Sequence, residues 1–503
     1  MKSYQVLVEA SGRPLPKEEH LAWRLAEIAS SDAPVDPVAG AMVANRLIDN
    51  AGVALAALST SSVQTALAQA RLYPRRGGAT LIGEVTGERY DCAWAAWANG
   101  VAVRELDLHD NYYGFGVAHP ADCIPPLLAV AEHCGRSGKD LTRAVLVAYD
   151  IIVALTSAID LNRAGVDHVA HLGPAVAAGV GSLLRLETEV IFEAINHAAH
   201  VSCAPLQARK GQISSWKAAA PAHVGKLAIE AVDRAMRGQT NPVPIYEGVS
   251  GLLATLFATP NGCEIKLPLP GEPHLAILET YPKAYAAGYH AQALIDLAFR
   301  MRTRITDLED VQSVVIHTKA YTHNYLGSGA NDPAKLDPRS SRETLDHSIM
   351  YMFAVALEDG CWHHDASYTP ARARRESTVR LWRKVSTIHD PKWSRRFSEP
   401  EPLDKDHGGH AVITMKDGTI VEDELDVPHS HPRGARPFAR ADYVAKFRGM
   451  AEGLMTDASI ADFLAAVDGL EALNSKGLGR LNLGKVHIRK YPSMRTGLFD
   501  FNA

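Results

Sequence analysis

The densest group of ionisable residues follows an apolar stretch at residues 94–103, in the string RELDLHDNYYGFGVAHPADC. This string contains Arg104, Asp107, Asn111 and His119. Carboxylates and imidazoles at a junction between buried helices cost free energy unless they are paired or used. Imidazoles suit proton transfer near neutral pH, and a carboxylate can orient them. The segment therefore predicts either acid–base chemistry or a set of helix caps and salt bridges, and alone it favours neither interpretation.

Two further segments place basic side chains next to helices. The string DHVAHLGP sets His168 and His171 before a Gly/Ala-rich helix, whose dipole lowers the pKa of an imidazole at its start. In QARKGQISSWKAAAPAH, Arg209 and Lys217 precede an Ala-rich helix, a position that suits an anion. Structural histidines and solvated lysines are the commoner outcome of such patterns, so both segments remain candidates.

Two later segments combine histidine with tyrosine. The string YPKAYAAGYHAQ contains His290, and TLDHSIMYMFAVAL contains His347 and Tyr351 four residues apart, on one face of an expected helix. The chain has 22 histidines, but none has the H-E-x-x-H spacing or an equivalent, so we expect no metal site. There is also no G-x-S-x-G motif for a nucleophilic serine.

The composition favours a globular protein that acts on a small molecule. The chain has 503 residues, 47% of them hydrophobic, and its net charge of −5 includes no basic stripe for nucleic acid. No run of eighteen apolar residues and no signal-peptide pattern is present, so we expect a cytoplasmic protein without a membrane anchor. The six cysteines lack the spacing of an iron–sulfur or zinc site. If the protein removed a hydroxyl group from its substrate, it would have to do so with side chains alone, because it lacks the cysteines that hold an iron–sulfur cluster.

The hydrophobic pattern predicts a mainly α protein with a large all-helical domain and a smaller α+β domain. The helical part spans residues 1–270, with helices expected at 35–58, 125–134, 141–159, 173–186, 187–200 and 218–236. Alternating β-branched residues at 311–320 and 410–427 place the α+β domain at 271–434, with a hairpin turn at residues 416–418. Residues 435–503 are expected to return as helices to the first domain.

These segments, taken in order, resemble the MmgE/PrpD family over essentially the whole chain. The string AWANGVAVRELDLHDNYY…AHPAD is similar to the family's N-G-x-x-x-x-x-x-D-F-x-D-T…H-P block, and GQISSWKAAA and DHSIMYMFAVAL also agree with it. The resemblance implies a helical domain built from both chain ends, a lid, a site in the cleft between them, and a homodimer. It departs at Leu108, where the family has Phe, and at Asn111, where it has Thr.

The resemblance also implies which residues form the active site. The expected catalytic residues are Asp107, His119, His171, Lys217 and Tyr351, and the expected substrate-binding residues are Arg104, Asn111, Arg209, His290 and His347. His119 and His171 would transfer protons, and replacement of His171 should abolish turnover. Lys217 and an arginine would hold substrate carboxylates.

Within the family, the motifs look most similar to the 2-methylcitrate dehydratases of propionate catabolism. The implied reaction is a metal-independent and cofactor-free loss of water from 2-methylcitrate, a small tricarboxylate, with citrate as a second substrate. The resemblance also allows a cis-aconitate decarboxylase or an imino-diacid epimerase. A non-catalytic binding protein on the same fold is the alternative from another class, and the joint presence of the five expected catalytic residues argues against it.

Overall fold

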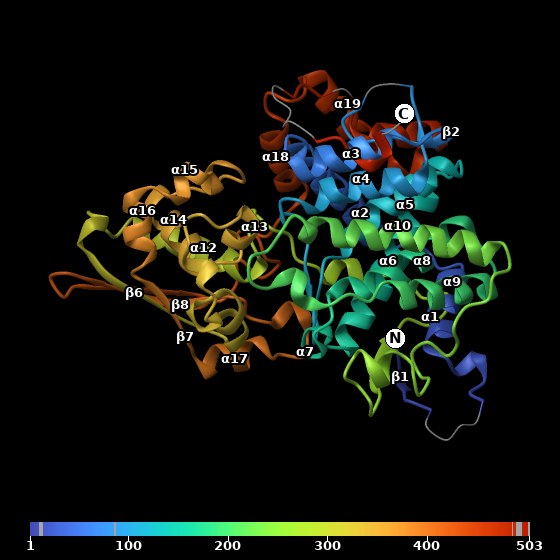
Figure 1. Ribbon diagram of the computed structural model, residues 1–503, viewed down its shortest axis with the longest axis horizontal. Coiled ribbons are helices and arrows are strands. Elements are labelled where there is room, and N and C mark those ends of the chain that lie inside the picture. The colour runs from blue at the N-terminus through green and yellow to red at the C-terminus, as the bar shows by residue number, and fades with distance from the viewer. Residues whose placement is uncertain (10–13, 85–86, 485, 489–494, 501–503) are drawn as a thin grey trace.

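The computed structural model describes residues 1–9, 14–84, 87–484, 486–488 and 495–500. A large helical domain lies beside a smaller domain that is built around a four-stranded sheet (Figure 1). Helices account for most of the regular structure, and the sheet contains both parallel and antiparallel neighbours. The predicted fold class, mainly α with a smaller α+β domain, is confirmed.

The helical domain is a bundle whose helices begin at capping residues. Asp36 accepts hydrogen bonds from the first amides of α2, and Ser137 and Asp140 form a capping box at the start of α6. The main helices are α1 (Leu21–Ser30), α2 (Pro37–Ala57), α3 (Ser61–Arg71), α4 (Cys92–Arg104), α5 (Ile124–His133), α6 (Gly138–Ala158), α8 (Leu172–Leu184), α9 (Thr188–Val201) and α10 (Trp216–Met236). The six helices expected from the sequence are all among them.

Helix α8 lies at the centre of this bundle and contacts α6, α9 and α10. Its Gly/Ala-rich sequence makes such close contacts feasible. A Cβ atom on Gly179 would lie 3.1 Å from the side chain of Ala148, and one on Gly173 would clash with Ser202. The small residues of this run therefore serve helix packing, as the sequence predicts.

Helix α6 is long and apolar enough to cross a membrane by composition alone. In the fold, 89% of its most apolar window is buried, and it packs against α8 and the strand β5 (Cys263–Leu267). This placement accounts for its hydrophobicity, because a helix that its neighbours cover on nearly all sides has little surface exposed to water.

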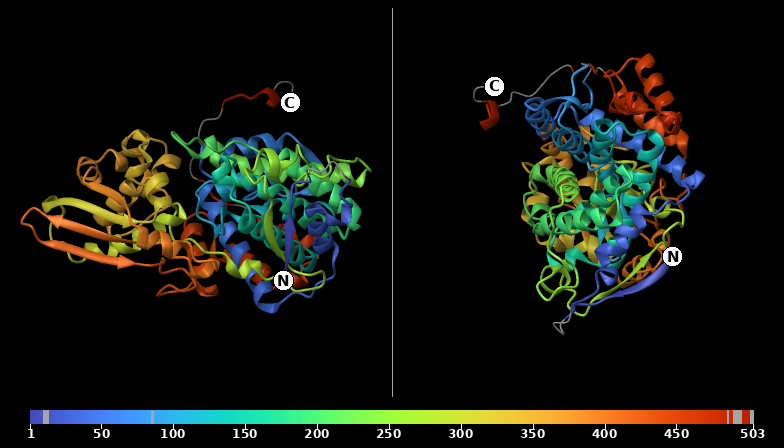
Figure 2. Two further views of the ribbon diagram at one scale, coloured as in Figure 1. Left: turned by 90° about the horizontal axis from the view of Figure 1, so that it is seen from below. Right: turned by 90° about the vertical axis from the view of Figure 1, so that its right-hand side faces the viewer.

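The N-terminal strand β1 (Lys2–Val6) was not expected from the sequence. It pairs antiparallel with β5, and Lys2 lies opposite Leu267 (Figure 2). The pairing joins segments more than 250 residues apart, so no local pattern reveals it. It fastens the start of the chain to the end of the helical segment.

The smaller domain is built on a sheet with the strand order β7-β6-β8-β9. Helices α12 and α14 pack against each other, α12 against β8 and β9, and α14 against β7. The hairpin of β8 and β9 turns at Lys416, Asp417 and Gly418, with Gly418 at φ 87°, as predicted. The elements are α12 (Tyr289–Arg302), β6 (Val311–Thr318), α13 (Arg342–Leu345), α14 (Ile349–Asp359), α16 (Glu376–Trp382), β7 (Val385–His389), α17 (Pro391–Phe397), β8 (Gly409–Met415) and β9 (Ile420–Leu425).

After the sheet, the chain returns to the helical domain. Helices α18 (Arg440–Ala451) and α19 (Asp457–Asp468) both pack against α2 (Figure 1). The contact is partly polar, since Arg46 of α2 donates a 2.9 Å hydrogen bond to Tyr443 of α18. Segments from both halves of the chain thus complete the helical domain.

Candidate active site

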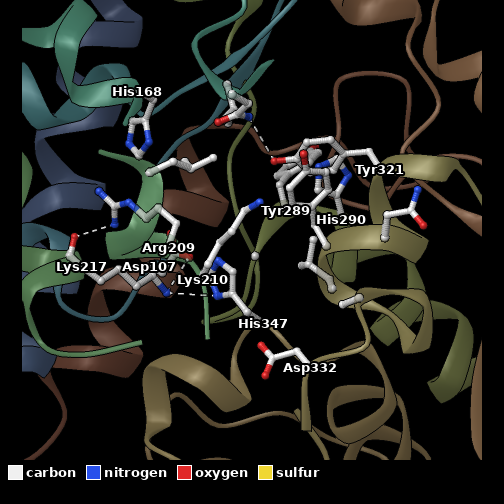
Figure 3. Close-up of a pocket in the computed structure, with 18 of the residues that line it drawn as sticks. Asp107, His168, Arg209, Lys210, Lys217, Tyr289, His290, Tyr321, Asp332 and His347 are labelled. Atoms are coloured by element: carbon white, nitrogen blue, oxygen red, sulfur yellow. Dashed lines mark hydrogen bonds and ion pairs between the residues drawn. The ribbon is translucent and has the colours of Figure 1, made fainter. Parts of the chain in front are cut away.

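A cavity of about 360 Å³ is lined by residues from both domains. Figure 3 shows charged side chains, including Asp107, Arg209 and Lys217, along one side and the rings of Tyr289, His290 and Tyr321 along the other. Eight of the ten site residues expected from the sequence line it: Arg104, Asp107, Asn111, His119, Arg209, Lys217, His290 and His347.

Asp107 is at the centre of the charged side. Helix α4 ends at Arg104, and the chain then turns sharply, with Asp107 at a left-handed φ of 49°. Its Oδ1 accepts hydrogen bonds from Arg104 and, at 2.6 Å, from Lys283, while Oδ2 lies 3.3 Å from Nζ of Lys217. Burial acts to raise the pKa of Asp107, but these three cations hold the pKa well below its ordinary value. The carboxylate is therefore ionised and organises three cations.

Lys217, in the first turn of α10, joins the two domains across the cavity. Its Nζ lies 2.8 and 2.9 Å from the two carboxylate oxygens of Asp346 and 3.3 Å from Nδ1 of His347. Burial and the charge on Lys217 lower the pKa of His347 to about 4. The imidazole of His347 is thus neutral at physiological pH, and the Lys217–Asp346 ion pair bridges the domains.

His119 is held in one tautomer. Its Nδ1 lies 3.0 Å from the carbonyl oxygen of Asp110, which can only accept, so Nδ1 carries the hydrogen. Burial and the cations Arg104 and Lys283 lower the pKa of His119 well below its ordinary value. The neutral ring therefore has its lone pair on Nε2, which lies 4.0 Å from the carboxylate of Asp107. Nε2 of His119 is therefore available to accept a proton.

A second imidazole lies next to His119. The ring of His168 is centred 5.3 Å from that of His119, and its Nδ1 lies 3.0 Å from Oδ1 of Asp167. Asp167 also binds Nε of Arg209 at 3.1 Å, and Arg209 donates in turn to the carbonyl of Lys217 at 2.8 Å. The three charged segments predicted from the sequence are thus connected by direct contacts.

The opposite side of the cavity is rich in aromatic rings. The ring centre of His290 lies 4.8 Å from that of Tyr113 and 4.7 Å from that of Tyr321. Burial lowers the pKa of His290 well below its ordinary value, so this imidazole is neutral. A ligand would therefore meet cations on one side and ring faces on the other.

The arrangement also contains a candidate cation site. Asp107, Asp346 and His347 offer ligand atoms that all lie within 4.8 Å of one another. The Nζ atom of Lys217 lies 3.3 Å from Asp107 and 2.8 Å from Asp346, so an ammonium group already stands between the two carboxylates. These residues are best described as a charge-paired cluster whose cation is a lysine.

Family models match both domains of this structure. The MmgE/PrpD N-terminal domain matches residues 19–262, and the MmgE/PrpD C-terminal domain matches residues 285–471. The chain belongs to the MmgE/PrpD family. The resemblance inferred from the motifs is confirmed.

Similar proteins carry names of one enzyme type. The mitochondrial 2-methylcitrate dehydratase of Yarrowia lipolytica is 25% identical over 76% of this chain and 74% of its own length. The 2-methylcitrate dehydratase of Cupriavidus necator is 25% identical over 77% and 81%, respectively. A probable 2-methylcitrate dehydratase of Saccharomyces cerevisiae is 25% identical over 77% of both chains. This chain is thus an MmgE/PrpD enzyme of the dehydratase type.

Two residues expected to be catalytic in this MmgE/PrpD enzyme, His171 and Tyr351, are not among the described residues that line the cavity. The Nε2 atom of His171 lies 3.5 Å from the carbonyl of Ile159, and its ring packs edge-on against Phe257. Of the two histidines in this turn, His168 lines the cavity, three residues before His171. Tyr351 lies in the first turn of α14, where its hydroxyl donates to the carbonyl of Ser367 and its ring packs edge-on against Trp382 in the smaller domain. Helix α14 begins after Ser348, so His347 and Tyr351 do not share a helical face as the sequence suggested.

We expect the variants His171→Asn and Tyr351→Phe to keep near-normal kcat. Tyr351→Phe removes only the 2.5 Å hydrogen bond to the carbonyl of Ser367, which costs about 1 kcal/mol of stability. Steady-state kinetics and thermal melting of both variants test this expectation. A folded variant that loses more than about tenfold in kcat, or about 1.4 kcal/mol of transition-state stabilisation, would return that residue to the site.

The sequence analysis missed one central residue, Lys283. It stands in the string YPKAYAAGYHAQ, which drew attention for its tyrosines and histidine. Its Nζ donates to both the side chain and the backbone carbonyl of Asp107, at 2.6 and 2.9 Å. The neighbouring backbones of Asn111 and Tyr281 exchange two hydrogen bonds, and this pairing brings Lys283 to the cavity. The local sequence Y-P-K does not predict that this segment pairs with residues so far away in the chain.

The two departures from the family pattern fall in different places. Asn111 lines the cavity, so its change from Thr alters the surface that meets the substrate. Leu108 is buried, and the described residues that line the cavity do not include it. Only the first departure is therefore expected to affect substrate choice directly.

Proposed function

We propose that this protein is a 2-methylcitrate dehydratase, which removes water from 2-methylcitrate to give 2-methyl-cis-aconitate. The observation that carries the proposal is the neutral His119, whose free Nε2 lies 4.0 Å from the carboxylate of Asp107, around which three cations gather. An elimination beside a carboxylate of the substrate uses a base to take the proton and cations to stabilise the negative charge. The names of the similar proteins support the choice of substrate.

The charge of the cavity favours a polycarboxylate. Among the lining residues that the structure describes, six are cationic and two are carboxylates: Arg104, Arg209, Lys210, Lys217, Lys283 and Lys335 against Asp107 and Asp332. The excess of four cations suits a substrate that has several carboxylates, such as a tricarboxylate. Fixed cations in a cleft with little water stabilise such charges strongly.

We assign the two proton transfers to His119 and Lys283. The Nε2 atom of His119 takes a proton from the substrate carbon next to a carboxylate, and the electron pair of the C–H bond forms the new double bond. The C–O bond breaks, and the departing hydroxyl leaves as water with a proton from Lys283. Burial lowers the pKa of Lys283 to about 8, which makes its ammonium a suitable acid near neutral pH. His119 then releases its proton to solvent, and Lys283 regains one.

The first test is an absorbance assay with EDTA-treated protein. We expect 2-methylcitrate to give rising ultraviolet absorbance, because the product has a conjugated double bond, and we expect the rate to survive chelation. Citrate is tested in parallel as the second substrate. Release of CO₂ from cis-aconitate would reassign the site to decarboxylation, and ligand binding without any turnover would reassign the protein to binding.

The pH dependence tests the acid. Lys283 donates only while it is protonated, so kcat/KM should fall as the pH rises through about 8, the pKa to which burial lowers this lysine. A pH–rate profile in buffers of constant ionic strength measures this fall in kcat/KM. A profile that stays flat for a full pH unit above that value would exclude Lys283 as the acid.

A further inference from the structure

A buried ammonium group lies beneath the charged side of the cavity. Lys446 of α18 donates to the carbonyl oxygens of Leu108 and Lys283, both at 2.8 Å, and to Oδ1 of Asp49 at 2.6 Å. Its side chain is 9% exposed and that of Asp49 only 1%. An ammonium has three hydrogens to donate, and here each has an acceptor. Lys446 thus joins three segments that are far apart in the sequence.

Two of these acceptors belong to the active-site segments themselves. Leu108 directly follows Asp107, and Lys283 contributes both the accepting carbonyl and the side chain that binds Asp107. The two segments also pair through the backbones of Asn111 and Tyr281, at 3.0 and 2.7 Å. The contact of the Lys283 side chain with Asp107 joins the segments a second time, and Lys446 adds a further connection from outside both segments.

The surrounding side chains support the same two segments. Arg46 of α2 lies 3.3 Å from the carboxylate of Asp110 and donates to both the carbonyl and the hydroxyl of Thr280. The carbonyl of Asp110 in turn holds His119. Polar side chains of helices α2 and α18 therefore support the base and the lysine of the site from below.

We propose that Lys446 is a positioning residue, which sets the place of Lys283 against Asp107 and so the geometry of proton transfer. The inference rests on the proposed function for the role of Lys283. The alternative is a purely structural role, in which Lys446 only fastens α18 to α2. The two roles predict different values of kcat for a folded variant from which the buried charges of Lys446 and Asp49 have been removed.

The test compares two variants with a matched control. Lys446→Met alone leaves the carboxylate of Asp49 buried without its ammonium and is expected to destabilise the protein. The double variant Lys446→Met/Asp49→Asn removes both charges, so the fold should tolerate it better. Arg448→Met changes an exposed cation on the same helix and serves as the control. Lys446→Gln, which keeps part of the hydrogen bonding, carries the test if the double variant does not fold.

For a positioning role, we expect the folded double variant to lose about 10²-fold in kcat, since small misplacements of reacting groups have effects of this size. KM should change much less, and the control should match the wild type. A loss in kcat of less than about tenfold in the folded protein overturns the proposal, because a structural link would affect stability and leave kcat unchanged.

A binding measurement separates this inference from the proposed function. Propane-1,2,3-tricarboxylate has the charges of citrate but no hydroxyl to lose, so its affinity does not depend on turnover. If the wild-type protein binds it but turns over no methylcitrate, the proposed reaction is wrong, and the positioning role, which rests on that reaction, is overturned with it. If the wild type is active, the folded double variant should bind the tricarboxylate nearly as well as the wild type, and a loss of affinity as large as the loss of kcat would overturn the positioning role.

Discussion

Replacement of His119 by Asn is expected to lower kcat by about 10²–10⁴-fold with little change in the affinity for propane-1,2,3-tricarboxylate. The asparagine amide can still donate to the carbonyl of Asp110, which fixes the imidazole at 3.0 Å in the wild type. It has no basic lone pair at the position of Nε2, so no group accepts the proton from the substrate carbon next to the carboxylate. Absorbance kinetics with 2-methylcitrate measure kcat, and calorimetry with the tricarboxylate measures binding.

The matched control for this experiment is His171→Asn. His171 is also a buried histidine whose pKa burial lowers, to about 3, but it lies outside the cavity lining. The same substitution at the two positions separates loss of the base from loss of packing. If His119→Asn retains more than about one tenth of wild-type kcat, the proton is taken by another group, and His168 would be the next candidate.

The second large effect is expected for Asp107→Asn. Asparagine tolerates the left-handed φ of 49° at this position, so the change removes the charge and keeps the backbone. Arg104, Lys217 and Lys283 would then be buried with less compensation, and loss of one partner from such a cluster typically costs about 3–5 kcal/mol. Urea denaturation measures the free energy of unfolding, and kcat should fall together with it.

Propane-1,2,3-tricarboxylate provides the critical comparison for Asp107→Asn. Its carboxylates can replace part of the lost charge, so it should raise the melting temperature of the variant more than that of the wild type. Asp332→Asn is the control, because Asp332 lies in the cavity wall 3.6 Å from Lys335 and does not contact the three central cations. Equal stability of Asp107→Asn and the wild type would show that the cluster does not depend on this carboxylate.

The sequence predicted the helices, the α+β domain and its hairpin because each has a local period. Eight of the ten expected site residues also line the cavity, and all eight lie in the segments that the sequence singled out. His168 lines the cavity and His171, the residue chosen from the sequence, does not, because the turn before α8 decides which of the two faces it, and no motif specifies that turn. Lys283 and Lys446 were missed because their partners lie 176 and 338 residues away in the chain. Contacts at that distance leave no trace in local composition.

The return of α18 to α2 has a consequence for synthesis of the chain. The ribosome releases residues in order, and α2 emerges nearly four hundred positions before Lys446. Until then the support that α2 and α18 give the site is incomplete, and the apolar face of α2 that α18 will cover is open to solvent or chaperones. A nascent chain of this enzyme should therefore bind ligand only after translation has passed α18, so that full-length synthesis itself acts as the checkpoint for activity.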